Sequence, residues 1–230
     1  MTPRPLPRAV IFDLDDTLFP ERDYAFSGFG AVATAFATTL GEPARALADM
    51  QRLYDSPDRS RVFNALLAER DLPDDRTLVE QMIATYRNHA PVISLYDDAE
   101  EMITLLRSRV RLGLITDGPA VMQRAKVRAL RLAERFDELI ITDELGPGWG
   151  KPHPLAFETI AKKLDVPHAA CTYVADNAGK DFVAPNELGW STIQIVRAQG
   201  IYAAQPAAPF GQPQRRIKSL SELAELVSDS

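Results

Sequence analysis

Short apolar runs alternate with helical patterns over most of the chain. Runs with the length and composition of buried strands occupy residues 9–13, 111–116, 138–143, 171–176 and 191–196. Several of these runs are unbroken rather than alternating, which is typical of parallel strands covered on both faces. Strands that alternate with helices in this way predict an α/β fold, with an open, mostly parallel sheet and helices on both of its faces.

Amphipathic helices are predicted around these strands. Residues 99–106 and 157–164 place apolar side chains at i, i+3, i+4 and i+7, which is the spacing of one helix face. Residues 220–227 repeat this spacing near the end of the chain. Residues 197–214 are instead interrupted by glycine and proline, so we expect an irregular segment there.

Residues 20–93 break the alternation of strands and helices. They contain no convincing strand, and their apolar spacing is helical almost throughout. A connection between two parallel strands needs only about a dozen residues, so this helical stretch is longer than a crossover requires. The sequence therefore predicts an α/β core formed by residues 1–19 and 94–230, with an all-helical domain inserted at residues 20–93.

Polar side chains collect where the predicted strands end. In an open parallel α/β sheet, ligands bind outside the carboxyl ends of the strands, so we expect a functional site at this edge. The polar residues that follow the first four strands are Asp13 and Asp15, then Thr116, Asp117 and Gly118, then Lys151, and finally Asp176, Asn177 and Asp181.

Composition and charge narrow the range of partners. The formal net charge is −6 and there is no dense run of lysine or arginine, which disfavours a nucleic-acid polymer or a membrane surface as partner. No apolar run reaches the roughly 18 residues of a membrane span, and the first residues lack the apolar segment of a secretory signal. Cys171 is the single cysteine, so no internal disulfide can form, and we expect a cytoplasmic protein.

Four short motifs occur in order along the chain: DLDDT at 13–17, LITDG at 114–118, GKPHP at 150–154 and VADNAGKD at 174–181. Together with the helical insertion after the first motif, they resemble the haloacid dehalogenase (HAD) superfamily over essentially the whole chain. The closest resemblance is to its phosphatases with a helical cap inserted after the first motif. The resemblance implies a Rossmann-like core and makes residues 20–93 a cap domain.

The resemblance also implies the chemistry of the motif residues. Asp13 would be the nucleophile that attacks phosphorus and forms an aspartyl-phosphate. Asp15 would be the general acid that protonates the leaving oxygen and then the base that activates water. Thr116 and the backbone N–H of Gly118 would donate hydrogen bonds to phosphoryl oxygens, and Lys151 would bridge the nucleophile and the phosphoryl group.

A metal ion, Mg²⁺, is a further implication of the resemblance. A carboxylate that approaches a phosphate dianion meets repulsion of roughly 4 kcal/mol per pair of unit charges at 4 Å in a medium of dielectric constant near 20, so the site needs cations. In the superfamily pattern, the ion would be held by the carboxylates of Asp13 and Asp176 and by the backbone carbonyl of Asp15, with water completing its shell.

Several neighbouring residues are expected to support these groups. Asp181 would act through the outer shell of the metal or by positioning Lys151, unless it only caps the following helix. Thr17 and Asn177 would support the loops of the first and fourth motifs. Asp16 is expected to hydrogen-bond backbone groups near the start of the cap rather than to contact substrate.

Other functions are compatible with parts of this pattern. A haloacid dehalogenase lacks an acid two residues after its nucleophile, so Asp15 argues against that chemistry. A phosphonatase forms a Schiff base through a cap lysine, whereas residues 20–93 contain no lysine. A phosphomutase acting on a sugar phosphate must shield its intermediate from water, which no motif reveals. A catalytically idle binding protein of the same fold is the alternative from another class.

The substrate is defined only as a small phosphorylated metabolite, with phosphoglycolate, a nucleotide and a sugar phosphate as candidates. The first helix of the predicted cap begins next to the nucleophile loop, so Arg22, Tyr24 and Ser27 are candidates for contact with substrate. The protein is expected to be a monomer or a homodimer.

Overall fold

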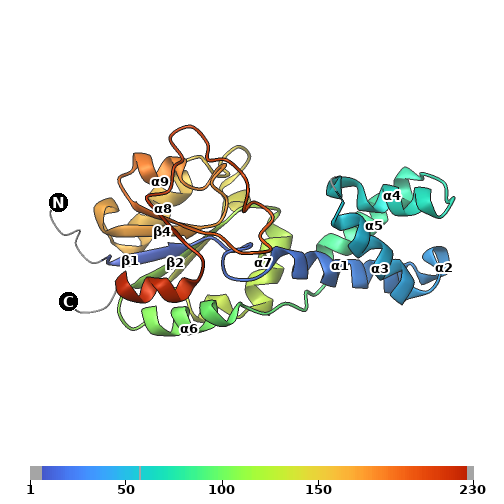
Figure 1. The fold of residues 1–230 in the computed structure, drawn as a ribbon, viewed down its shortest axis with the longest axis horizontal. Helices are drawn as coiled ribbons and strands as arrows, with labels where there is room; N and C mark the ends of the chain where they lie inside the picture. Colours follow the sequence, from blue (N-terminus) through green and yellow to red (C-terminus); the bar gives the residue numbers. More distant parts are fainter. Residues whose placement is uncertain (1–6, 57, 227–230) are drawn as a thin grey trace. The chain divides into compact units, whose positions relative to one another are not determined.

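The computed structural model describes residues 7–56 and 58–226, which form two compact units. One unit combines the chain up to Glu21 with the chain from Ser94 onward, and the other is Arg22–Ile93. Every strand of the described residues belongs to the first unit, whereas the second is helical (Figure 1). The sequence predicted the inserted domain at residues 20–93.

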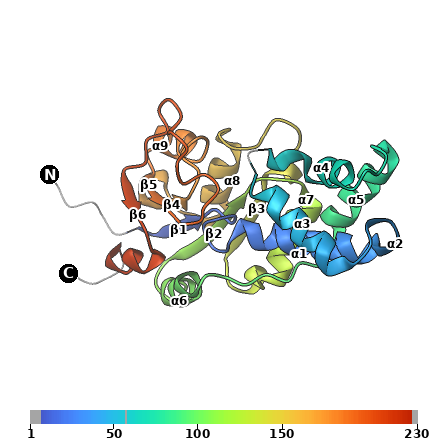
Figure 2. The ribbon, with the colours of Figure 1, turned by 45° about the vertical axis from the view of Figure 1, so that its right-hand side comes forward.

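A six-stranded parallel sheet forms the centre of the first unit (Figure 2). Its strands are β1 (Ala9–Phe12), β2 (Arg111–Thr116), β3 (Glu138–Ile141), β4 (Cys171–Ala175), β5 (Ser191–Ile195) and β6 (Arg215–Ile217). They lie in the order β3-β2-β1-β4-β5-β6, and every pair is parallel, which confirms the predicted sheet. The edge strand β6 was not predicted, because its sequence, RRI, is short and mostly polar.

Helices cover both faces of this sheet. The helices are α6 (Asp97–Leu106), α7 (Ala120–Ala129), α8 (Leu155–Leu164) and α9 (Val183–Glu187), with the 3₁₀ helix η5 at Leu220–Leu226. α8 and α9 lie on one face, and α6 and η5 lie on the other (Figures 1 and 2). An α-helix was predicted at 220–227, but η5 has the tighter 3₁₀ form, and Val227 lies outside the described residues. Within the described ranges, no helix combines the length and apolarity needed to cross a membrane.

β1 lies inside the sheet and is buried along its whole length. Ile11 pairs with Gly113 of β2 on one side and with Tyr173 of β4 on the other. Gly113 allows α8 to pack closely, because a Cβ atom there would lie 2.8 Å from Ile160 Cδ1 and 2.9 Å from Ile11 Cγ1. This dense packing fixes the carboxyl end of β1, where the predicted nucleophile follows.

The second unit is a helical bundle with a hydrophobic core of its own. Its helices are α1 (Glu21–Ala35), α2 (Ala37–Leu40), α3 (Pro43–Tyr54), α4 (Val62–Glu69) and α5 (Arg76–Asn88), with a 3₁₀ turn at Arg59–Arg61. Phe29, Met50, Leu66 and Met82 are among the apolar side chains buried at its centre. A separate core of this kind is the property that defines a domain.

Residues 197–214 form no helix or strand, as predicted, but they pack against two loops at the carboxyl edge of the sheet. The backbone N–H of Ile201 donates to the Asp16 carboxylate at 2.7 Å, in the loop after β1. The N–H of Ala208 donates to the carbonyl of Ala178 at 2.9 Å, in the loop after β4. This irregular segment therefore helps to fix the positions of both loops.

Candidate active site

Asp13 follows directly after β1 and forms part of a buried ion cluster. Lys151 Nζ lies 2.6 Å from Asp13 Oδ1 and 2.7 Å from Asp181 Oδ1. The same ammonium group donates to the Tyr173 hydroxyl at 3.1 Å. The Lys151 side chain is 0% exposed, so these charges interact with little screening by water. The fold thus brings together Asp13, Lys151 and Asp181, which are far apart in the sequence.

The loop after β4 supplies a third carboxylate. Both oxygens of Asp181 are engaged, because Oδ1 faces Lys151 and Oδ2 accepts the Asn177 N–H at 3.0 Å. Asp181 Oδ1 has this ion pair but no hydrogen bond, whereas the buried Oδ2 atom of Asp176 has neither a hydrogen bond nor an ion pair among the described residues. Carboxylate oxygens of Asp13, Asp176 and Asp181 all lie within 4.8 Å of one another. Asp181 is therefore tied to Lys151, whereas Asp176 has an oxygen available for a ligand.

This carboxylate cluster fits a divalent cation. Two carboxylates at this upper limit of 4.8 Å repel one another by about 3.5 kcal/mol in a medium of dielectric constant near 20. Burial raises the pKa of Asp13 to about 7 against the opposing effect of Lys151, and Asp181 adds to the rise. Burial also raises the pKa of Asp176, and Asp13 and Asp181 add to that shift. Hard carboxylate oxygens in such a cluster are ligands that Mg²⁺ prefers.

Thr116 is the last residue of β2, and Gly118 follows the strand at the same edge of the sheet. Thr116 Oγ1 is buried and has no hydrogen-bond partner within the part of the chain that the structure describes. An unpaired buried hydroxyl costs about 1–3 kcal/mol, so a ligand oxygen that accepts its hydrogen bond would complete the site. Gly118 has φ of +131°, and a Cβ atom would lie 3.0 Å from Gln123 Nε2, so this turn requires glycine.

Asp15 is held by two residues of α7 for which the sequence had suggested no role. Lys126 Nζ lies 2.6 Å from Asp15 Oδ1, and Gln123 Nε2 donates to Oδ2 at 3.0 Å. Gln123 and Lys126 are both buried. Polar side chains are buried at a free-energy cost, so these two contacts define a specific position for the Asp15 carboxylate.

Asp117 connects three loops of the site, although no role was predicted for it. Its carboxylate accepts hydrogen bonds from Thr142 Oγ1 at 2.5 Å, from the Lys151 backbone N–H at 3.1 Å and from Lys180 Nζ at 2.9 Å. Burial acts to raise the pKa of Asp117, but Lys151 and Lys180 hold it below its ordinary value. The charged carboxylate of Asp117 therefore anchors the loop that carries Lys151.

Asp16 and Thr17 support the loop after β1. The Asp16 carboxylate accepts the Glu21 N–H at 2.8 Å and the Ile201 N–H at 2.7 Å, which confirms that it binds backbone groups, one of them at the first residue of α1. The Thr17 carbonyl accepts a hydrogen bond from Arg197 Nη2 at 2.9 Å. These hydrogen bonds connect the loop after β1 to the start of α1 and to residues 197 and 201.

The three residues proposed for substrate contact in the helical unit have partners within that unit. Arg22 forms an ion pair with Asp55 at 3.3 Å. Tyr24 is buried, with its ring centroid 4.8 Å from that of His89. The Ser27 hydroxyl accepts the Val92 N–H at 2.9 Å. These contacts favour packing roles for Tyr24 and Ser27 over contact with substrate.

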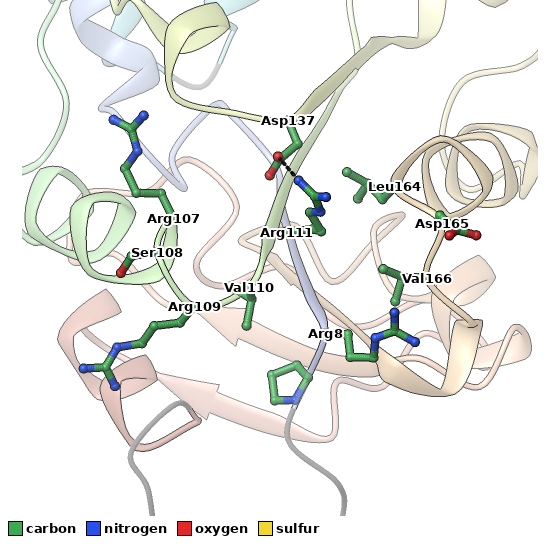
Figure 3. Close-up of a pocket in the computed structure, with 11 residues that line it drawn as sticks. Arg8, Arg107, Ser108, Arg109, Val110, Arg111, Asp137, Leu164, Asp165 and Val166 are labelled. Atoms are coloured by element: carbon green, nitrogen blue, oxygen red, sulfur yellow. Dashed lines mark hydrogen bonds and ion pairs between the residues drawn. The ribbon is translucent and has the colours of Figure 1, made fainter.

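A separate hollow of about 450 Å³ lies at the opposite edge of the sheet, where β1 and β2 begin (Figure 3). Arg8, Arg107 and Arg109 line it, but their guanidinium groups point in different directions (Figure 3). Arg111 in the same hollow is paired with Asp137 at 2.9 Å. Because these groups do not converge on one point, the carboxyl edge of the sheet is the better candidate for the active site.

A parallel α/β sheet whose carboxyl edge carries buried acids, a buried lysine and an open hydroxyl has the layout of a hydrolytic enzyme. The chain belongs to the haloacid dehalogenase-like hydrolases, because the model of that family matches residues 7–189. The predicted resemblance and the predicted fold class are therefore confirmed.

Two curated relatives align with nearly the whole chain. The glyceraldehyde 3-phosphate phosphatase of Methanopyrus kandleri is 29% identical, over 96% of this chain and 97% of its own. The N-acylneuraminate-9-phosphatase of Rattus norvegicus is 24% identical, over 96% of this chain and 93% of its own. Among solved structures, the HAD-hydrolase YfnB of Bacillus subtilis has a TM-score of 0.67 and 18% identity, covering 97% of this chain and 99% of its own. At this low identity, the structural similarity shows that the two proteins share a fold.

Proposed function

We propose that this hydrolase is a Mg²⁺-dependent phosphatase that cleaves a small phosphate monoester through an aspartyl-phosphate on Asp13. The observation that carries the proposal is the cluster of Asp13, Lys151 and Asp176, with the buried hydroxyl of Thr116, which lacks a hydrogen-bond partner among the described residues, at the same edge of the sheet. The names of the two curated relatives support the same reaction class.

The first half of the reaction would transfer the phosphoryl group to the enzyme. A carboxylate oxygen of Asp13 forms a bond to phosphorus while the bond from phosphorus to the leaving oxygen breaks. Asp15 gives its proton to that leaving oxygen, so the product departs as an alcohol. Lys151 and the N–H and hydroxyl groups of the Thr116–Gly118 turn stabilise the negative charge on the phosphoryl oxygens.

The second half would return the enzyme to its starting state. The Asp15 carboxylate takes a proton from water as the water oxygen forms a bond to phosphorus. The bond between phosphorus and the Asp13 oxygen then breaks, and inorganic phosphate leaves. Asp15 ends the cycle protonated again, because the proton that left with the alcohol is replaced by one taken from water.

The carboxylates of Asp13 and Asp176, with the backbone carbonyl of Asp15, would hold the Mg²⁺ ion. The ion supplies positive charge that offsets the repulsion between the acids and the phosphate dianion. Asp181 forms an ion pair with Lys151 and accepts a hydrogen bond from the Asn177 N–H. These contacts support a role in positioning the lysine rather than in binding the metal directly.

The helical unit at residues 22–93 would act as a cap that selects the substrate. A cap excludes water when it closes and contacts the part of the substrate that leaves. Arg22 is the proposed substrate contact that keeps a partly exposed charge, with a side chain that is 31% exposed. Its cationic group suits a substrate with a second anionic or polar group.

Phosphate release from a panel of monoesters tests the proposed function. The panel would contain p-nitrophenyl phosphate, glyceraldehyde 3-phosphate, phosphoglycolate, sugar phosphates and nucleoside monophosphates, each with Mg²⁺ and with a chelator. We expect Mg²⁺-dependent release of inorganic phosphate. No release from any member would contradict the proposal, and isomerisation of a sugar phosphate without release would instead support a phosphomutase.

Magnesium is expected to stabilise the protein more at about pH 8 than at about pH 5.5. The folded-state pKa of Asp13 is raised from 3.8 to about 7, so the metal-free fold is favoured below pH 3.8 and loses this stability as the pH rises through about 7. At the higher pH the ion neutralises carboxylates that have lost their protons. At the lower pH it must displace protons.

Thermal unfolding with Mg²⁺ and with a chelator at the two pH values measures this effect. The Asp176→Asn variant should lose most of the stabilisation by Mg²⁺, while Asp97→Asn, which changes an exposed aspartate, should keep it. An equal Mg²⁺-induced shift in Tm at both pH values would contradict the assignment of the ion to this cluster.

Replacing Asp117 by alanine is expected to lower kcat by about 10- to 100-fold, with a smaller change in KM. The change removes the acceptor for the Lys151 backbone N–H and for Lys180 Nζ, so the loop that carries Lys151 loses its anchor. Steady-state kinetics on the best substrate of the panel measures the effect. Asp97→Ala is the matched surface control, and an unchanged kcat in Asp117→Ala would exclude the anchoring role.

A further inference from the structure

Two buried polar side chains on α7 have no place in the reaction as described so far. Lys126 has a side chain that is only 5% exposed, and its Nζ lies 2.6 Å from Asp15 Oδ1. Gln123 is also buried, and its Nε2 donates to Asp15 Oδ2 at 3.0 Å. Each oxygen of the Asp15 carboxylate is thus contacted by a different residue of one helix.

The burial of Lys126 next to Asp15 does not by itself indicate a stabilising role. A buried ion pair often contributes no more than a well-packed apolar pair, because both charges lose their hydration. A helix face that contacts the core normally carries apolar side chains, and Leu130 occupies the next turn of this face. The retained charge at Lys126 therefore points to a task at Asp15.

The same helix is joined to the turn that would bind the phosphoryl group. α7 begins at Ala120, immediately after the turn formed by Thr116 and Gly118. Gln123 Nε2 also donates to the backbone carbonyl of Asp117 in that turn. One rigid element therefore sets the distance between the Asp15 carboxyl group and the phosphoryl-binding groups.

We propose that Lys126 and Gln123 are positioning residues for the general acid. They fix the orientation of the Asp15 side chain relative to Thr116 and Gly118, so that its carboxyl group faces the leaving oxygen of the phosphoryl group bound there. This inference rests on the proposed phosphatase function, because it assigns the two residues to the step in which the leaving oxygen is protonated.

The reactivity of the leaving group separates this role from a general effect on the fold. The leaving group of an alkyl phosphate such as glycerol phosphate is a strongly basic alkoxide, which needs the proton. The leaving group of p-nitrophenyl phosphate is a weakly basic phenolate, which does not. The ratio kcat/KM covers steps only up to formation of the phosphoenzyme, so it isolates leaving-group protonation from the later attack of water.

Lys126→Met is expected to lower kcat/KM for glycerol phosphate by about 10- to 100-fold, a part of the roughly 10²–10⁴-fold contribution of general acid catalysis. The value for p-nitrophenyl phosphate should change by no more than about 3-fold. Lys126→Arg should recover much of the loss, because arginine can still donate to the carboxylate. Gln123→Leu should show the same dependence on the leaving group, to a smaller extent.

Circular dichroism and the Tm of each variant report whether it is folded, and Lys162→Met, at an exposed position of α8, is the matched control. If Lys126→Met does not fold, Lys126→Arg and Gln123→Leu carry the comparison. Equal losses with both substrates, or no loss with either, would overturn the positioning role alone. Absence of phosphate release by the unchanged protein from these two substrates and from every member of the panel would overturn the proposed function and this inference with it.

Discussion

Replacement of Asp13 by asparagine is expected to lower kcat by at least about 10⁴-fold, to the limit of detection. The amide cannot form the bond to phosphorus that the carboxylate forms, so the phosphoenzyme cannot accumulate. Asparagine has nearly the same shape, and its side-chain oxygen can still accept a hydrogen bond from Lys151, which lies 2.6 Å from Asp13 Oδ1. The loss should therefore reflect chemistry rather than unfolding.

Release of inorganic phosphate from p-nitrophenyl phosphate in the presence of Mg²⁺ measures this prediction. Asp97→Asn makes the same chemical change at an exposed position and should retain full activity. A Tm for Asp13→Asn close to that of the unchanged protein would show that the fold is kept. Substantial turnover by the folded Asp13→Asn variant would rule out Asp13 as the nucleophile.

Loss of Lys151 is the second change with a large expected effect. In Lys151→Met, kcat should fall by about 10²–10³-fold, because a preorganised charge beside the phosphoryl group is removed. The metal-free protein should also lose about 3–5 kcal/mol of unfolding free energy, since Asp13 and Asp181 would stay buried without the cation that now lies 2.6 and 2.7 Å from them.

Urea unfolding with and without Mg²⁺ separates the two consequences of the Lys151 change. Added Mg²⁺ should recover part of the lost stability, because it places positive charge in the same carboxylate cluster, but it should not restore kcat. Lys162→Met, which removes an exposed lysine, should affect neither quantity. A Lys151→Met variant with unchanged stability and activity would contradict the described ion cluster.

The parallel sheet could be predicted because the apolar pattern of each buried strand reflects its surroundings in the fold. β1 and β4 are unbroken apolar runs because they lie inside a sheet covered on both faces. β6 is different, because the edge strand Arg215–Ile217 has one neighbour and keeps polar side chains. Its position depends on pairing with β5, a long-range contact that its own sequence does not encode.

Most of the core site residues predicted from the sequence lie at the carboxyl ends of strands. Asp13, Thr116 and Asp176 each follow an apolar run, and parallel strands place such residues at one edge. Lys151 lies on a longer loop, so its position could not be predicted from the end of a strand. Its place in the cluster is shown by its ion pairs with Asp13 and Asp181. Those ion pairs depend on three-dimensional packing.

The supporting residues that sequence reasoning missed carry a weaker signal. Gln123 and Lys126 are three residues apart and lie in line with Leu130, so they occupy positions i, i+3 and i+7 of a core-facing stripe. Polar residues on such a stripe could have marked a buried polar function. Charged residues near the end of a helix are usually solvated, however, so the pattern did not separate Lys126 from its exposed neighbours.

Trapping of the covalent intermediate tests the central claim most directly. Enzyme mixed with substrate and Mg²⁺ would be quenched within one turnover and treated with borohydride, which reduces an acyl phosphate to an alcohol. The modified residue would then be located by peptide mass spectrometry. The account predicts a modification at Asp13 that requires substrate and is absent from Asp13→Asn. Phosphate release without any modified aspartate, or with the modification at another residue, would contradict it.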